Sequence, residues 1–344
     1  TPDHASGLRN LSAAGAGASS GFTSSQVCRL GGGFGAGKTS QAFLLISNYM
    51  KEVPNSKCIY VKAEGRLSED LRNRTGLTFV TQAEEWKTGT VFVLETNQFE
   101  TMAEILETLL KSMHSNGERL CCIIDSLDGL ILSNDLNAKS ISDNIMVGGV
   151  PKITKLFFRR MALPINKYNS FFCILSQVST EIKLNPYEKS APRAMNGVGG
   201  NSICHASDVV LEAQNRNNSD LILESPKERP SVTNRVLGHE VTWKIVKSPN
   251  ETESIVCKVP IKRGRIGNGV WVEKEIVDIC LSAEMLKKSG AWFNFDKDLI
   301  EEAKKDNVVL KEQLHGLDAA YSYVEENKEV FDWLLAKIKR VFIG

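Results

Sequence analysis

The 344-residue chain lacks any apolar run long enough to span a membrane, and its formal net charge is only +1. A spanning helix is therefore not expected, and the charge balance gives no global signal for a polyanionic partner. No secretory signal is visible, and no internal repeat indicates a solenoid. Hydrophobic residues make up 42% and charged residues 24%, which suits a globular protein with one large and one smaller domain.

The eight cysteines include no C-x-x-C pair, and several lie inside apolar runs such as 120–124. This placement disfavours a zinc site or a disulfide framework. We therefore expect reduced, buried thiols in a cytoplasmic protein. Residues 1–25 are rich in Gly, Ala and Ser, and this composition predicts a flexible lead-in.

A complete phosphate-binding motif, G-x-x-x-x-G-K-[ST], fills residues 32–39. Its glycines let backbone N–H groups approach phosphate oxygens, Lys38 supplies charge to the outer phosphates, and the Thr39 hydroxyl is a ligand for Mg²⁺. A predicted strand at 26–30 and a predicted helix at 40–50 flank it. The predicted nucleotide-binding residues are Gly32, Gly33, Phe34, Gly35, Ala36, Gly37, Lys38, Thr39 and Ser40.

Short apolar runs alternate with helical patterns up to about residue 208, which predicts an α/β fold with a mostly parallel sheet covered on both faces. Beyond that point, polar turns separate short runs that predict an antiparallel extension of the sheet. The predicted strands are 57–61, 91–94, 120–124, 170–175, 209–212, 241–246, 255–259 and 269–272. The predicted helices include 99–113, 153–161, 282–289, 299–312 and 317–343.

The resulting domain prediction has three parts. Residues 1–25 form the lead-in, 26–274 form the ATPase core, and 275–344 form a small α-rich C-terminal domain.

Three polar residues follow predicted strands, where ligands of parallel sheets gather. Asp125 ends a buried strand and is the candidate Mg²⁺ carboxylate, together with Thr39. Glu64 follows the strand at 57–61 and can orient a water against the γ-phosphate. Gln177 follows the strand at 170–175 and can contact the γ-phosphate through its amide. Taken singly, each of these residues could also be a solvated or capping side chain at a strand end.

In this order, these residues resemble the RecA-type recombinases, including their phage UvsX branch. The likeness continues through Gly199-Gly200-Asn201 and the Gly-Ala-Trp segment at 290–292, and it covers roughly residues 26–344. It implies a RecA-like P-loop ATPase core that uses ATP and Mg²⁺. It also implies that Glu64 is the general base and that Gln177 couples the γ-phosphate to a DNA-binding loop.

The resemblance places two DNA-binding loops, at about 133–149 and 178–200. The DNA-binding residues it implies are Gly148, Gly149, Lys183, Lys189, Arg193, Asn196, Gly199, Gly200 and Asn201. Lys247 corresponds to a lysine that reaches the ATP of a neighbouring protomer, whereas Pro249 stands where bacterial members carry a second lysine. The basic group Lys262, Arg263 and Arg265 either guides duplex DNA or consists of ordinary solvated side chains of a hairpin.

The function implied by the resemblance is homologous pairing and strand exchange by a helical filament on single-stranded DNA, with DNA-stimulated ATP hydrolysis. The implied partners are single- and double-stranded DNA, further copies of the chain, and single-strand-binding or loader proteins. Two alternatives stay open from the sequence. A ring-forming DNA motor would share the P-loop, Asp125 and Glu64, and a regulator could bind ATP without acting on DNA.

Overall fold

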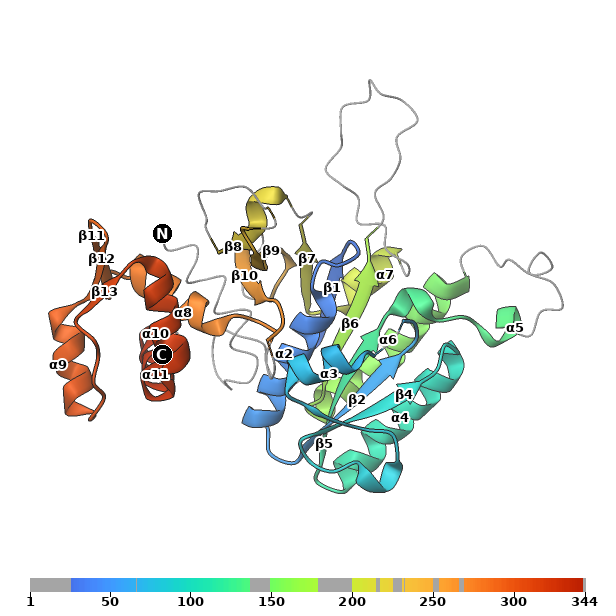
Figure 1. Cartoon of the computed structure of the whole chain (residues 1–344). Coiled ribbons are helices and arrows are strands. Elements are labelled where there is room, and N and C mark those ends of the chain that lie inside the picture. The colour runs from blue at the N-terminus through green and yellow to red at the C-terminus, as the bar shows by residue number, and fades with distance from the viewer. Residues whose placement is uncertain are drawn as a thin grey trace.

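The computed structural model describes residues 26–65, 67–136, 149–178, 200–214, 217–224, 231, 233–249, 254–265 and 269–342. Within these residues, a ten-stranded sheet carries helices on both faces, and a smaller unit of helices and a three-stranded sheet follows it (Figure 1). This arrangement confirms the predicted α/β fold with a mostly parallel central sheet.

The large sheet has the order β10-β9-β7-β1-β6-β5-β2-β4-β3, and β8 pairs with β9. The pairings from β3 through to β7 are parallel, whereas β8, β9 and β10 add an antiparallel extension as predicted. The strands are β1 (Val27–Gly32), β2 (Ser56–Lys62), β3 (Thr78–Val80), β4 (Thr90–Glu95), β5 (Arg119–Asp125), β6 (Phe171–Gln177), β7 (Val209–Ala213), β8 (Leu221–Leu223), β9 (Val236–Lys247) and β10 (Val256–Lys262).

The central strands carry apolar side chains on both faces, and helices cover both faces of the sheet. Helix α2 packs with β1, β7, β9 and β10 in one apolar cluster, and α4 and α6 pack on the other face with β5 and β6. The helices of the core are α2 (Lys38–Glu52), α3 (Glu69–Thr75), α4 (Phe99–Ser115), α5 (Ser133–Leu136), α6 (Gly149–Lys167) and α7 (Gly200–Ala206), with short 3₁₀ turns η1 (Ala83–Glu85), η2 (Leu127–Gly129) and η3 (Asn218–Asp220).

A third apolar cluster, which runs from Trp271 to Ile338, is the core of the C-terminal unit. The elements of this unit are α8 (Val272–Ser282), β11 (Leu286–Ser289), β12 (Trp292–Phe295), α9 (Lys297–Lys305), β13 (Gln313–His315), α10 (Leu317–Glu326) and α11 (Lys328–Phe342). Strands β11, β12 and β13 form a separate antiparallel sheet.

Several predicted elements of this region are wrong. The predicted strand 269–272 is only an isolated bridge between Val270 and Ile261, because α8 already begins at Val272. The predicted helix 282–289 is instead the end of α8 followed by β11. Gly290, at φ +63°, turns a hairpin between β11 and β12 rather than ending a helix. The predicted helix 317–343 divides at Asn327 into α10 and α11.

All eight cysteines are free thiols, and seven of them are buried, as the sequence predicts. Across the described ranges, no helix is both long and apolar enough to cross a bilayer.

Candidate nucleotide site

The phosphate-binding loop leaves the sheet at the carboxyl end of β1 and enters α2 directly. Gly35 and Gly37 have φ values of +67° and +81°, a left-handed backbone that only glycine adopts at little cost. Gly32 is required by packing, because a Cβ there would lie 2.8 Å from the Cβ of Ala213 on β7. Since α2 begins at Lys38, the positive end of its dipole faces this loop.

The Lys38 ammonium lies within the loop itself. Its Nζ donates hydrogen bonds of 2.8 Å to the carbonyl oxygens of Gly32 and Gly33. Burial lowers the pKa of Lys38, while the nearby carboxylates of Asp125, Asp128 and Glu64 oppose that shift. A cation is thus held where the outer phosphates of a nucleotide would need it.

Asp125, at the end of β5, and Thr39, at the start of α2, form a pair of hard oxygen donors. The Thr39 hydroxyl donates to Asp125 Oδ2 at 3.0 Å, and the Tyr60 hydroxyl donates to the same oxygen at 3.0 Å. Burial raises the pKa of Asp125, although these two hydrogen bonds favour its charged form. A buried carboxylate next to a hydroxyl fits Mg²⁺, which prefers oxygen ligands.

Glu64 is held by side chains from two other strand ends. Its Oε1 accepts a short hydrogen bond from the Ser126 hydroxyl and a 3.4 Å hydrogen bond from Gln177 Nε2. Gly129 makes room for it, because a Cβ at that position would lie 3.0 Å from the Glu64 Cβ. The backbone N–H of Gln177 donates to Asp128 Oδ2 at 2.7 Å. The sequence predicted Glu64 and Gln177 but not Ser126, Asp128 and Gly129, which follow β5 and position them.

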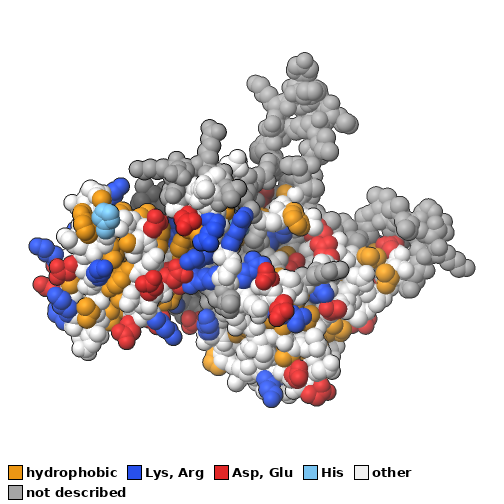
Figure 2. Space-filling view, in the orientation of Figure 1, with side chains coloured by type: hydrophobic (Ala, Val, Ile, Leu, Met, Phe, Trp, Pro, Cys, Tyr) orange, Lys and Arg blue, Asp and Glu red, His pale blue; other side chains and the backbone are white. Residues whose placement is uncertain are grey.

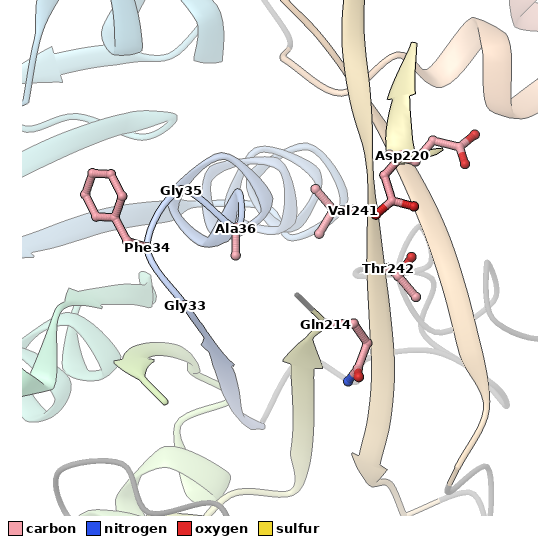
Figure 3. A pocket seen from close by; sticks show the side chains of 9 residues that line it. Gly33, Phe34, Gly35, Ala36, Gln214, Asp220, Val241 and Thr242 are labelled. Atoms are coloured by element: carbon pink, nitrogen blue, oxygen red, sulfur yellow. The ribbon is translucent and has the colours of Figure 1, made fainter. Parts of the chain in front are cut away.

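A cavity of about 380 Å³ lies against the phosphate-binding loop on the side of β9 (Figure 3). Phe34, Ala36, Val241 and Gln214 are among the residues that line it, and the Phe34 side chain is fully exposed. The P-loop therefore has an open flank beside the sheet extension.

Comparison with known proteins gives a consistent result at low identity. No protein-family model matches the chain. The chain is 23% identical to the protein RecA of Azospirillum lipoferum over 322 residues, which cover 93% of this chain and 75% of that protein. It is 22% identical to the protein RecA of Bdellovibrio bacteriovorus over 321 residues, or 92% of this chain and 71% of the relative. The protein RecA of Wolinella succinogenes is 22% identical over 319 residues, which are 92% of this chain and 77% of that protein.

The chain is RecA-like. The similarity runs through the core and the C-terminal unit. The P-loop, Thr39 and Asp125 provide a donor set that fits a nucleotide and Mg²⁺.

In this RecA-like chain, Lys247 lies away from its own P-loop. It ends β9, next to Val210 at the start of β7, whereas the P-loop follows the far end of β1. Its Nζ donates to the carbonyl oxygens of Cys204, His205 and Ser207, the last at 2.6 Å. Lys247 therefore caps the C-terminal end of α7 within its own chain, where a cation is favoured by the helix dipole.

Most of the predicted DNA-binding residues lie outside the described residues: Gly148, Lys183, Lys189, Arg193, Asn196 and Gly199. Gly149 begins α6, and Gly200 and Asn201 begin α7. A basic surface on α6 was not predicted from the sequence. Helix α6 contains no acidic residue, and it exposes Lys152, Lys155, Arg159, Arg160 and Lys167.

The basic group at 262–265 joins the two parts of the molecule. Lys262 pairs with Glu325 of α10 at 2.7 Å and lies 4.4 Å from the Trp271 ring centre, and Arg265 binds Glu273 of α8 through both its terminal nitrogens. Arg263 alone of the three is exposed. Figure 2 shows basic and acidic side chains gathered between the C-terminal unit and the core. These contacts favour a structural role for Lys262 and Arg265.

Proposed function

We propose that this RecA-like chain is a cytoplasmic recombination ATPase that forms a filament on single-stranded DNA and catalyses homologous pairing and strand exchange. The observation that carries the proposal is the convergence of Thr39, Asp125, Glu64 and Gln177 at the carboxyl ends of β1, β5, β2 and β6. The similarity to RecA proteins over more than nine-tenths of the chain supports it.

In the proposed ATPase reaction, the loop amides and Lys38 bind the phosphates, and Thr39 and Asp125 hold Mg²⁺. The metal would neutralise charge that develops on the transferred phosphoryl group. Glu64 acts as the general base that orients the attacking water. Ser126 and Gln177 fix the Glu64 carboxylate from two sides, which limits the positions its oxygens can adopt.

Gln177 also links hydrolysis to DNA in this proposal. It ends β6, two residues before the segment 179–199 that contains Lys183, Lys189 and Arg193. The exposed basic side chains of α6 extend a phosphate-binding surface from the other loop. Since phosphate contacts would dominate, affinity for single-stranded DNA should be salt-dependent and nearly independent of sequence.

The proposed filament places ATP between protomers, with Lys247 contributing in trans. Within its own chain Lys247 binds α7, so the trans contact requires this ammonium to exchange partners. Single-strand-binding or loader proteins would be the further partners of the filament, along with duplex DNA as the second strand-exchange substrate.

The test is joint-molecule formation between homologous single- and double-stranded DNA, with ATP and Mg²⁺, followed by electron microscopy of the same sample. We expect homology-dependent joint molecules and helical filaments. Closed rings without joint molecules would contradict strand exchange and indicate a ring-forming DNA motor. Nucleotide binding with neither DNA binding nor turnover would instead indicate a regulator.

A further inference from the structure

A fully buried arginine lies in the central strand β1. Arg29 is 0% exposed, and its neighbours in the sheet are Ile174 of β6 and Val210 of β7. Burying a guanidinium is costly unless its donors are satisfied, and sequences rarely place one in the middle of a sheet. Its position three residues before Gly32 therefore calls for an explanation beyond packing.

The two partners of Arg29 come from either end of one chain segment. Its Nε donates to Ser176 Oγ on β6 at 2.8 Å, and its Nη1 donates to Cys204 Sγ on α7 at 2.6 Å. Residues 179–199, the second proposed DNA loop, lie between Ser176 and Cys204 in the sequence. The planar, rigid guanidinium of Arg29 thus contacts both the strand that precedes this segment and the helix that follows it.

Neither partner neutralises the charge of Arg29. A hydroxyl and a thiol are its hydrogen-bond acceptors, and Nη2 is buried without a hydrogen-bond partner in the described part of the chain. A well-packed apolar side chain would serve stability at least as well as such a group. The buried position of Arg29 is therefore better explained by the link that it makes between Ser176 and Cys204 than by a contribution to stability.

The same strand continues into the phosphate-binding loop. Gly32, at the end of β1, pairs with Gln177, which directly follows Ser176. Movement at the end of β1 or β6 would therefore be transmitted to Arg29 and from there to α7. Lys247 binds the carbonyl oxygens of Cys204, His205 and Ser207 at the same end of α7, so two cationic side chains tie the C-terminal end of this helix to the core.

We propose that Arg29 is a positioning residue that ties Ser176 to Cys204 and so couples the nucleotide site to both ends of segment 179–199. This inference deepens the proposed function, since the segment is the one to which DNA binding is assigned. The coupling acts through Arg29 and does not require contact between Arg29 and nucleotide or DNA.

The test is hydrogen–deuterium exchange of the full chain without DNA, read in peptides that cover 174–178 and 200–207, with and without Mg·ATPγS. In the parent, nucleotide should slow exchange in both peptides. In Arg29→Met and Arg29→Lys, we expect the peptide at 174–178 to respond and the peptide at 200–207 to lose its response. An unchanged response of both peptides in both variants would overturn the proposal.

Two further variants keep the test valid if Arg29 substitutions fold poorly. Ser176→Ala and Cys204→Ala each remove one hydrogen-bond partner of Arg29. Each variant should abolish the slowing of exchange by nucleotide in the 200–207 peptide, and the double variant should show no larger effect. Additive effects would contradict a single connecting residue. Cys28→Ala, which lies on β1 in the opposite apolar cluster, is the matched control and should lower the melting temperature while leaving the coupling intact.

This readout separates the inference from the proposed function. If single-stranded DNA fails to stimulate hydrolysis in the parent, the recombinase assignment fails, but exchange at 200–207 still reports the coupling. Where the parent is stimulated, the stimulation should fall severalfold in Arg29→Met while turnover without DNA stays within twofold of the parent. Equal loss of both activities would indicate a general structural defect and would contradict a positioning role.

Discussion

The Glu64 carboxylate, which follows β2, accepts a hydrogen bond from the Gln177 amide at the end of β6, although these two strands are not neighbours in the sheet. Their Oε1 and Nε2 atoms lie 3.4 Å apart, although β5 separates β2 from β6 in the sheet. Ser126, which follows β5, bridges the gap by donating to the same carboxylate oxygen. The candidate base is therefore oriented by side chains at the ends of β5 and β6, the strands that end in Asp125 and Gln177.

Replacing Glu64 tests the assignment of the base. Glu64→Gln should lower kcat for ATP hydrolysis by about 100-fold or more, because general-base catalysis is worth that much, while nucleotide affinity stays within about 3-fold. Single-turnover kinetics and fluorescent-nucleotide binding measure the two quantities. Glu95→Gln is the matched control, since Glu95 ends the adjacent strand β4 and pairs with Lys62 at the surface. Similar loss in both variants would refute the assignment.

Asp125 should oppose folding when no metal is bound. Burial raises its pKa, so the folded chain binds a proton more tightly than the unfolded chain, and stability is lost as pH rises through that pKa. We expect Asp125→Asn to raise the melting temperature at pH 8 in EDTA and to weaken Mg²⁺-dependent nucleotide binding at least tenfold. A lower melting temperature in EDTA would show that the charge is already compensated within the chain.

Glu275 gives the junction with the C-terminal unit a dependence on alkaline pH. It borders a cavity of about 90 Å³ between β9, β10 and α8, and burial together with the Asp278 charge raises its pKa to about 8, against the opposing pull of Lys274. Its contribution to stability is complete below the unfolded pKa, near 4.5, and is lost as pH rises through about 8.

Urea unfolding between pH 6 and pH 9.5 measures this effect. The free energy of unfolding should fall with pH in the parent, by an amount on the order of 1–3 kcal/mol, and less steeply in Glu275→Gln. Glu301→Gln, which alters an exposed residue of α9, should follow the parent. Parallel curves for all three proteins would contradict the assigned pKa.

Substitutions of Arg263 and Arg265 should show whether each side chain contributes to stability or to the binding of duplex DNA. Arg265→Ala breaks a half-buried, two-point ion pair with Glu273 and should cost about 1–3 kcal/mol of stability, with little effect on duplex DNA affinity. Arg263→Ala should leave thermal stability within about 0.5 kcal/mol, since it changes an exposed side chain. Thermal denaturation and fluorescence anisotropy with duplex DNA measure both. Loss of duplex affinity in Arg265→Ala alone would favour the DNA-guiding interpretation.

Lys247 has a contact within its chain and a proposed one in trans. Lys247→Ala should cost about 1 kcal/mol of stability at concentrations where the chain is monomeric, because three carbonyls at the end of α7 lose their cation. Mixing Lys247→Ala with Lys38→Ala should partly restore hydrolysis, since some interfaces then combine an intact P-loop with an intact Lys247. Absence of restoration would contradict the trans contact.

The sequence could predict the P-loop, Asp125 and Glu64 because strand ends of a parallel sheet share one edge. Their order along the chain is enough to place them there. It could not predict Ser126, Tyr60 or Gly129 as supports, since those contacts depend on β5 lying between β2 and β6. Arg29 was missed for the same reason, because its partners are 147 and 175 residues away.

The C-terminal unit shows where local patterns mislead. Gly290 resembles a helix-ending glycine, yet Leu286, Phe293 and Phe295 are buried in a hairpin that turns at this residue. The decision between helix and strand there depends on packing against α8 and α10, which the local spacing of apolar residues does not contain.

The most direct test of the central claim is the rate of ATP hydrolysis with and without homopolymeric single-stranded DNA, at low and high salt. The account predicts strong stimulation by DNA that high salt weakens and that Glu64→Gln abolishes. Turnover by the parent that is indifferent to DNA at every salt concentration would contradict the proposal that this RecA-like chain is a recombination ATPase.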